Sequence, residues 1–245
     1  MKRFDRVSWS RWFLAIVAIM VGTTLSGCLK GDNQVYQVSA VRALNAVPGS
    51  VQLDMFLDQK KFNFDNVAWE DEAFAYADTL PYKNAWPNSR LVSIVDPEDY
   101  PNAEPIVQKT INFIPGKFYS VYVVGYDEME LLATEDDLSE PEAGKAKVRF
   151  IHLSPDAPAL DIEIQAGTGD PMRVDDNAFK EHSDFIAIEG GVACTINFID
   201  HGNQDVLHTF GFSPEAGMIY TVWAKGLLGN TADTVLDFGH GVIIH

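Results

Sequence analysis

Three polar side chains at alternate positions are the first candidates for chemistry. His152, Ser154 and Asp156 lie in the run 148–162, where an apolar stretch ends in a turn that begins at Pro155. A hydrolytic triad needs a base that reaches the nucleophile and a third group that orients the base. Three alternate residues entering a tight turn instead point apart or hydrogen-bond the turn backbone. We therefore expect a structural role for all three, and no enzyme activity from them.

A weaker copy of this run occupies residues 41–55. Both copies keep one arginine and one aspartate: Arg42 with Asp54, and Arg149 with Asp161. An exposed ion pair contributes only about 0–1 kcal/mol, so retention of the pair in diverged repeats suggests burial. We predict a structural ion pair across adjacent strands in each copy.

The segment 62–89 is rich in aromatic residues and is the candidate binding face. Trp69, Tyr82 and Trp86 could provide amphipathic contact area for a sugar ring or a protein partner. We expect Tyr82 and Trp86 to be the exposed pair, because they lie in residues 82–87, where we place the extra length of the first repeat. The other aromatic residues are expected in the core: Phe62, Phe64, Phe74 and Tyr76.

The charge of the chain limits its partners. Lys and Arg number 18 against 35 Asp and Glu, a net charge of −17, and such a surface repels nucleic acid and anionic lipid headgroups. The acidic clusters lack the spacing and the central glycine of a calcium loop. No HExxH or paired-cysteine zinc motif occurs. We expect no cofactor, and only weak surface calcium binding stays open.

The N-terminus has the form of an export signal. Basic residues precede a short apolar core, and Leu25-Ser26-Gly27-Cys28 follows. This end resembles the bacterial lipobox, which implies cleavage after residue 27 and acylation of Cys28. The membrane partner is then the lipid on Cys28, and leucine at the next position favours the outer membrane, with the periplasmic or surface face left open. The second cysteine, Cys194, lies in a strand-like run and is expected to be a buried apolar residue.

Short strand patterns divide the rest of the chain. Apolar and polar residues alternate at 53–58 and 160–165, and the runs 118–125 and 218–226 are rich in β-branched and aromatic residues. Further strands are expected at 91–95, 106–113, 194–199 and 206–212, with a tail strand around 234–238. Only 68–77 could form a helix. Short strands at this spacing are typical of β-sandwiches.

The predicted organisation has five parts. Residues 1–27 are the lipoprotein signal peptide, and 28–37 are the acylated cysteine and a tether. Residues 38–133 are a first, diverged β-sandwich module, 134–146 an acidic linker, and 147–245 a second module with a C-terminal strand. The fold class is therefore all-β, with two tandem immunoglobulin-like or Greek-key sandwiches.

The run from Val148 to Pro158, followed by Leu160-Asp161-Ile162, resembles the signature of the "domain of unknown function 4397" family. Residues 144–147 and the segment from Gly217 to Val222 fit the same family, and the first module departs from it at residues 45–51. The resemblance implies tandem β-sandwich modules of exported, often lipid-anchored bacterial proteins. It implies no activity.

Three functional hypotheses follow. The first is a lipid-anchored cell-envelope binding or scaffold protein, acting in surface adhesion or glycan binding on an unknown protein or glycan ligand. The second is a periplasm-facing accessory of envelope assembly. A hydrolase is a distant third, because the residues supply no nucleophile and base at a workable spacing.

Overall fold

Strand β11 (Lys145–His152) shows how the sequence pattern produces a sheet with two buried faces. Val148 and Phe150 alternate with Arg149 and Ile151, and all four are at most 1% exposed. Successive side chains of a strand point to opposite faces. One set therefore packs inside its own sandwich, and the other set packs against residues from the first half of the chain. Burial on both faces explains why apolar residues occur in both alternating sets of the second half of this strand.

The computed structural model describes residues 37–99, 104–230 and 234–245. Among these residues the only helix is the three-residue turn η1 (Pro97–Asp99), so the all-β prediction is confirmed. The predicted signal peptide and Cys28 lie outside the described residues. Residues 37–245 belong to one compact unit.

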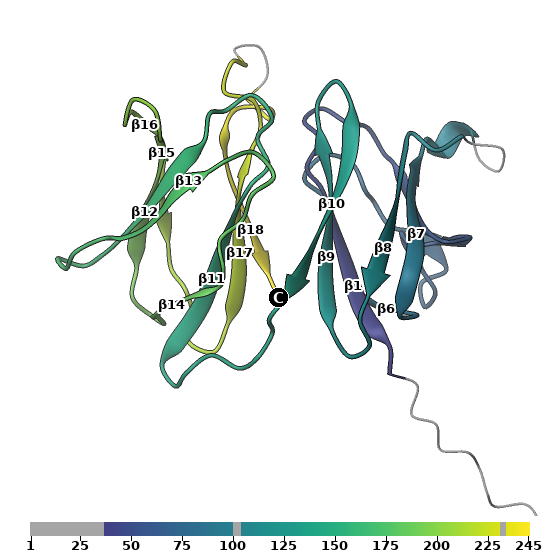
Figure 1. Ribbon diagram of the computed structural model, residues 1–245, viewed down its shortest axis with the longest axis horizontal. Helices are drawn as coiled ribbons and strands as arrows, with labels where there is room; N and C mark the ends of the chain where they lie inside the picture. Colours follow the sequence, from purple (N-terminus) through teal and green to yellow (C-terminus); the bar gives the residue numbers. More distant parts are fainter. Residues whose placement is uncertain (1–36, 100–103, 231–233) are drawn as a thin grey trace, which may run out of the picture. The chain divides into compact units, whose positions relative to one another are not determined.

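The first sandwich has two four-stranded sheets and a small hairpin (Figure 1). One sheet has the order β10-β9-β1-β6, the other has the order β3-β2-β7-β8, and β4 pairs with β5. The strands are β1 (Ser39–Asn45), β2 (Asp54–Leu57), β3 (Lys60–Lys61), β4 (Phe64–Asp65), β5 (Glu70–Asp71), β6 (Thr79–Ala85), β7 (Asn88–Val95), β8 (Val107–Phe113), β9 (Phe118–Gly125) and β10 (Met129–Asp136).

The second sandwich repeats this strand order. Its sheets are β14-β11-β17-β18 and β13-β12-β15-β16. In both sandwiches the first strand pairs in parallel with the last but one, in the same register: Val41 lies opposite Tyr119, and Val148 opposite Tyr220. The strands after β11 are β12 (Leu160–Ala166), β13 (Met172–Asn177), β14 (Ile186–Glu189), β15 (Cys194–Asp200), β16 (Val206–Phe212), β17 (Ile219–Lys225) and β18 (Gly239–Ile244).

Side-chain contacts repeat along with the strands. Tyr119 accepts a hydrogen bond at its hydroxyl from the Ile114 amide (3.1 Å), and Tyr220 accepts one from the Glu215 amide (3.0 Å). Each tyrosine ring also meets a phenylalanine edge-on, with centroids 5.1 Å and 5.2 Å apart. The internal repeat is therefore a repeat of structure, including its turn contacts.

Three apolar clusters hold the compact unit together. One lies between the two sheets of the first sandwich, and one between the two sheets of the second. The third is shared by the two halves, with Leu44, Tyr122 and Val124 from the first and Ile151 and Trp223 from the second. The outer faces of the β1 and β11 sheets are thus a common core and not solvent-facing surfaces.

A buried ion pair crosses this shared core. Arg149 donates from Nη2 to Oδ1 of Asp136 at 2.7 Å, and the two side chains are 2% and 0% exposed. Arg149 also donates to the Tyr122 hydroxyl and to Thr221 Oγ1, both at 3.1 Å. Asp136 accepts from the Ser120 and Tyr82 hydroxyls, both at 2.7 Å. Both charges therefore have partners, as a buried ion pair requires.

Each of the two repeated arginines donates a hydrogen bond to the other half of the chain. Arg149 donates to the Glu135 carbonyl (3.2 Å), and its repeat counterpart Arg42 donates to the Ile244 carbonyl (2.9 Å). Each guanidinium also lies over an aromatic ring of its own sandwich, at 4.6 Å from Phe185 for Arg149 and 5.3 Å from Tyr82 for Arg42. The interface therefore has an approximate internal two-fold relation.

His245 occupies the position that matches Asp136 in this relation. Asp136 pairs with Phe118, the first residue of β9, and the His245 amide donates to the carbonyl of Ile219, the first residue of β17. The ring of His245 lies 2.7 Å from Thr221 Oγ1 and 2.8 Å from the Tyr82 hydroxyl. Burial, with smaller effects from the two arginines, lowers the pKa of His245 to about 4.

The predicted pairing of Arg149 with Asp161, and of Arg42 with Asp54, is wrong. In each repeat the arginine and the aspartate belong to different sheets. Asp161 instead bonds Arg173 (3.2 Å) and His201 (2.7 Å), and Asp54 bonds Lys61 (2.7 Å). The retained arginine serves the contact between the sandwiches, while the retained aspartate serves its local loops.

Several boundaries differ from the sequence expectations. No helix forms at 68–77, where β5 and a turn lie, and the tail strand is β18 and not 234–238. Strand β10 extends to Asp136, so its last three residues fall within the predicted linker. The extra length of the first repeat lies mostly before Tyr82: Val41 and its partner Lys83 are 42 residues apart, against 38 for Val148 and Ile186.

The buried ion pair leads to a stability prediction. Arg149→Leu should lower the free energy of unfolding by about 3–5 kcal/mol, because Asp136 is left buried without its cation. Lys117→Leu is the matched control, since Lys117 and Glu135 form an exposed pair worth about 0–1 kcal/mol. Urea unfolding of both variants measures the difference. Equal stability of the two variants would contradict the role given to Arg149.

Candidate functional site

The three aromatic residues of the predicted binding face do not lie together. Trp69 and Trp86 are 78% and 59% exposed, whereas Tyr82 is half-buried at the interface between the sandwiches. Burial raises the pKa of Tyr82 far above its ordinary value, and the hydroxyl is bonded to Asp136. The expectation that Tyr82 and Trp86 form an exposed pair is therefore wrong: Tyr82 lies within β6 and contacts the other sandwich, whereas Trp86 follows the last residue of β6, in the turn to β7.

Trp86 lines a groove on the first sandwich, which we call the aromatic groove. It encloses about 620 Å³, within the usual range for ligand sites. Apolar, amide and charged side chains all contribute to its lining. The lining residues are Leu57, Asp58, Gln59, Lys60, Lys61, Phe62, Phe64, Asn66, Lys83, Asn84, Ala85, Trp86 and Arg90.

Arg90 holds the two rims of this groove in place. Its Nε and Nη2 donate to the carbonyls of Trp86 and Pro87, both at 3.0 Å, on the β6–β7 turn. Its Nη1 lies 3.2 Å from Oδ2 of Asp58, on the β2–β3 turn. Asp58 in turn accepts from the Leu91 amide at 2.9 Å. One side chain thus fixes the spacing of both turns and positions the backbone of Trp86.

The β4–β5 hairpin places Trp69 beside the groove. Its ring meets Phe64, a lining residue, edge-on with centroids 5.5 Å apart. The hairpin turn is closed by Asp65, whose carboxylate accepts from the Val67 and Ala68 amides, and these bonds lower the pKa of Asp65. Trp69 itself has φ of 59°, a left-handed conformation that is uncommon for an aromatic residue. The turn therefore holds the Trp69 side chain exposed beside the groove.

Lys83 fastens the hairpin to the sheet beneath it. Its ammonium donates to the carbonyls of Phe62 (2.8 Å) and Phe64 (3.1 Å) and to the carboxylate of Glu72. Lys61 bridges Asp54 (2.7 Å) and Asp71 (2.8 Å). Burial alone would lower the pKa of Lys61, but its two carboxylate partners raise it, so this side chain stays charged.

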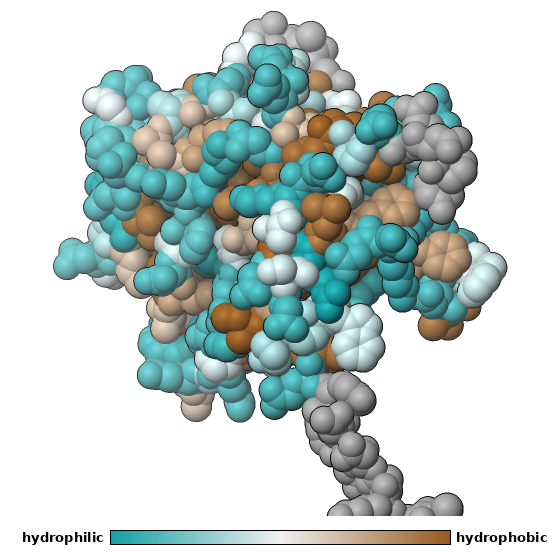
Figure 2. All heavy atoms as spheres, turned by 45° about the vertical axis from the view of Figure 1, so that its right-hand side comes forward, coloured by the Kyte–Doolittle hydropathy of each residue, from teal (hydrophilic) through white to brown (hydrophobic). Residues whose placement is uncertain are grey.

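Hydrophilic side chains predominate on the side of the molecule that carries the first sandwich. Figure 2, in which the first sandwich comes forward, shows apolar side chains in small separate groups among hydrophilic ones. A broad apolar patch is the usual mark of a surface that docks another protein. The face in Figure 2 shows none, and the mixture of aromatic and hydrogen-bonding groups that line the groove suits a polar ligand.

The predicted turn residues are joined by hydrogen bonds to the backbone. His152 Nδ1 accepts from the Ser154 amide (3.3 Å), and its Nε2 lies 2.9 Å from the Pro158 carbonyl. Ser154 Oγ donates to the Gly226 carbonyl at 2.7 Å, and Asp156 accepts from the amides of residues 228 and 229. Burial lowers the pKa of His152. Both ring nitrogens of His152 thus contact backbone groups, and the Ser154 hydroxyl is hydrogen-bonded to a backbone carbonyl.

The first repeat performs the same task with a different residue. Asn45, the counterpart of His152, accepts at Oδ1 from the Val47 amide (3.1 Å), two residues further on as in the second repeat. Its Nδ2 donates to the Phe74 carbonyl at 3.0 Å. An amide can therefore replace the imidazole at this turn, which argues against proton transfer as its purpose.

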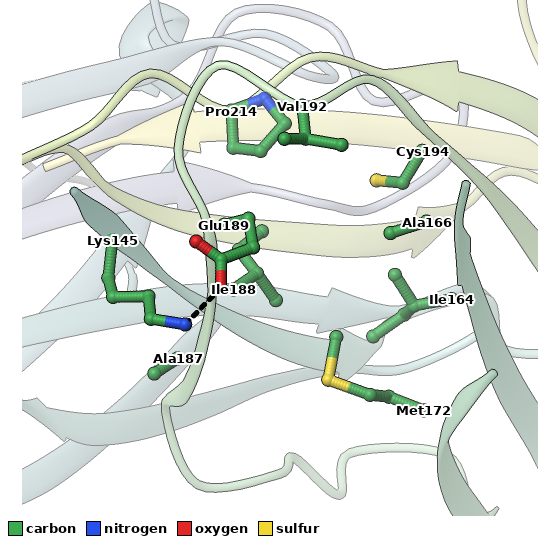
Figure 3. Close-up of a pocket in the computed structure, with 10 residues that line it drawn as sticks. All are labelled: Lys145, Ile164, Ala166, Met172, Ala187, Ile188, Glu189, Val192, Cys194 and Pro214. Carbon is green, nitrogen blue, oxygen red and sulfur yellow. Dashed lines mark hydrogen bonds and ion pairs between the residues drawn. The ribbon is translucent and has the colours of Figure 1, made fainter. Parts of the chain in front are cut away.

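Cys194 lies in a separate small pocket of the second sandwich. The pocket encloses about 130 Å³ between Ile164, Ile188 and Met172, with Lys145 and Glu189 bonded at one side (Figure 3). Cys194 is a buried free cysteine, and burial raises the pKa of its thiol. A thiol of this kind is not a nucleophile near neutral pH.

Two histidines on different sheets meet at one edge of the second sandwich. Nε2 of His208 and Nδ1 of His240 are 2.9 Å apart, and His240 stacks on Phe210 at 3.6 Å. Burial lowers the pKa of both imidazoles, that of His240 to about 4. Within the part of the chain that the structure describes, no three His, Cys, Asp or Glu side chains gather as metal ligands.

Among residues 37–99, 104–230 and 234–245, no helix has the length and apolar character needed to cross a bilayer.

Sequence reasoning found Trp69 and Trp86 but missed most of the groove. Lys60, Phe64 and Arg90 join the site only because the β2–β3 turn, the hairpin and the start of β7 meet in the fold. One signal was present: Lys60-Lys61 is a basic pair in a strongly acidic chain. The contact of Arg90 with backbone carbonyls leaves no trace in sequence.

The comparison of the two turns predicts the effect of substitutions at His152. His152→Asn should change the free energy of unfolding by less than about 1 kcal/mol, because asparagine already fills this position in the first repeat. His152→Ala should cost about 1–3 kcal/mol, since buried backbone groups lose their partners. Thermal unfolding of both variants checks this. Equal losses in the two variants would show that the imidazole has a role that an amide cannot fill.

Several solved structures are distantly similar to this chain. A family CBM26 module from Eubacterium rectale Amy13K, in complex with maltoheptaose, is 10% identical with a TM-score of 0.26, covering 82% of this chain and all of that one. A streptococcal virulence factor, described for alpha-glucan binding, is 11% identical (TM-score 0.24, covering 77% and 92%). A C-terminal fragment of the pilus adhesin SpaC from Lactobacillus rhamnosus GG is 10% identical (TM-score 0.23, covering 84% and 86%). TM-scores this low define neither the fold nor a ligand of this chain.

No curated protein matches the sequence. One family description does: the domain of unknown function DUF4397 matches residues 39–163, from β1 to β12. The match covers the whole first sandwich, although the sequence motifs resemble the family more closely in the second. Because it spans more than half of the 245 residues, the chain belongs to the DUF4397 family.

Proposed function

We propose that this protein is a lipid-anchored glycan-binding protein of the cell envelope, with the aromatic groove as its binding site. The observation that carries the proposal is an exposed Trp86 in a groove whose rims are fixed by Arg90. Stacking of a sugar ring on an indole combines apolar contact with a polar rim. A groove that is already shaped loses little conformational entropy on binding.

The groove suits binding better than catalysis. Asp58 is its sole carboxylate among the lining residues, and its oxygens are bonded to Arg90 and the Leu91 amide. Glycoside hydrolysis requires two carboxyl groups on either side of the scissile bond. Recognition of a glycan needs only the stacking surface and the hydrogen-bonding side chains that line this groove.

The groove proposal predicts a specific loss of binding. Trp86→Ala should weaken glycan binding tenfold or more, about 1.4 kcal/mol, and leave the melting temperature unchanged, because the carbonyl that Arg90 binds is retained. Tyr126→Ala is the matched control, since Tyr126 is 54% exposed in the same sandwich but does not line the groove. Affinity electrophoresis against a panel of soluble polysaccharides measures both. If no polysaccharide retards the wild-type chain, the function is not glycan binding.

The anchor and the location form a separate part of the proposal. Lipidation at Cys28 would hold an acidic protein on a membrane whose headgroups repel it, because acyl chains bind through their methylene groups. Leucine after the cysteine favours the outer membrane. A surface-facing position would give the groove access to external glycans.

Protease treatment of intact and lysed cells checks the location. We expect digestion in intact cells and release of a Cys28→Ala variant into the soluble fraction. Protection in intact cells with digestion after lysis would favour a periplasm-facing role in envelope assembly. Membrane retention of Cys28→Ala would reject the lipid anchor.

A further inference from the structure

The charge of the aromatic groove is opposite to that of the chain. The whole sequence has 18 basic and 35 acidic residues. The lining has four basic residues, Lys60, Lys61, Lys83 and Arg90, against the single acid Asp58. A basic lining in so acidic a protein requires its own explanation, because solubility alone would favour acidic residues here too.

Two of these cations, Lys61 and Lys83, pair with carboxylates outside the groove lining, and Arg90 pairs with Asp58 within it. Asp54, which is 3% exposed, and Asp71 both pair with Lys61, and Glu72 pairs with Lys83. None of these three carboxylates lines the groove. In the ion pairs of Lys61 and Lys83, the lysine therefore lines the groove and its carboxylate partners do not.

The lining retains more hydrogen-bond donors than its own bonds use. An ammonium has three N–H groups and a guanidinium has five. Lys83 uses all three, but Lys61 uses two and Arg90 three. The side chain of Lys60 is exposed and forms no hydrogen bond or ion pair with any residue that the structure describes. The spare groups are therefore cationic donors, which pair best with an anionic acceptor.

We infer that the aromatic groove selects a glycan that carries carboxylates, that is, a uronic-acid polysaccharide. The inference rests on the proposed glycan binding and adds the class of sugar. Trp86 contributes the stacking face, which is the same for neutral and acidic sugars. Lys60, with the spare donors of Lys61 and Arg90, contributes the preference for charge.

The test compares an acidic polysaccharide with its neutral methyl ester. Affinity electrophoresis with polygalacturonate and its methyl-esterified form compares one backbone with and without its carboxylates, and alginate and dextran extend the comparison. We expect at least tenfold tighter binding to the acidic polymers. Raising the salt from about 50 to 500 mM should reduce that advantage, because it screens exposed charges.

A pair of charge reversals assigns the effect to the groove. Lys60→Glu should weaken binding to polygalacturonate tenfold or more and leave binding to the methyl ester within twofold. Lys117→Glu changes the net charge equally at an exposed residue outside the groove, and should change binding less than twofold. Unchanged melting temperatures exclude misfolding.

Each other outcome contradicts one of the two proposals or both. If acidic and neutral polymers bind equally and Trp86→Ala loses binding to both, the preference for acidic sugars is rejected and the glycan-binding proposal is retained. Equal losses in Lys60→Glu and Lys117→Glu would mean that overall charge, and not the groove, decides. No binding to any polymer would reject both proposals together.

Discussion

The buried contact between Arg149 and Asp136 constrains more of this structure than any other interaction. Both charges are almost fully removed from water, so each needs the other as its partner. Separating the strands that carry them would therefore cost a large free energy. Those strands, β10 and β11, are the end of one sandwich and the beginning of the next. The shared apolar cluster around Leu44, Ile151 and Trp223 then packs in a fixed arrangement. The β1 sheet of one sandwich and the β11 sheet of the other consequently bury one face against each other.

This joint core determines where a binding site can lie. The outer faces of the β1 and β11 sheets are taken up by the interface, including Tyr82, which sequence reasoning expected at the surface. The groove instead uses the β2–β3 turn, the β4–β5 hairpin and the β6–β7 turn of the first sandwich. The first repeat is longer than the second before Tyr82, and the hairpin that carries Trp69 lies there. Extra chain in one copy thus distinguishes two otherwise matching sandwiches.

Local sequence patterns predicted the strands but not their partners. Alternation at 160–165 identified β12 because it reflects a strand's own period of two, and the β-branched and aromatic residues at 118–125 identified β9 because such residues favour strands. Strands β6, β13 and β14 were missed, since their burial depends on neighbours far along the chain. The recurrence of Arg149 and Asp161 indicated structural importance correctly, but not that the arginine pairs with Asp136. Sequence spacing cannot show which sheet a side chain faces once a strand is buried on both sides.

The near two-fold relation between the sandwiches has an evolutionary consequence. An interface that exchanges equivalent contacts, as Arg42 and Arg149 do with the carbonyls of residues 244 and 135, is what two identical subunits form when they dimerise. In a homodimer, every substitution appears twice. Here the matching positions hold an aspartate and a histidine, Asp136 and His245, so one arginine has an anionic partner and the other lies near an imidazole whose pKa is lowered. Joining both copies in one chain allows such asymmetry. One copy can then carry the aromatic groove while the other does not.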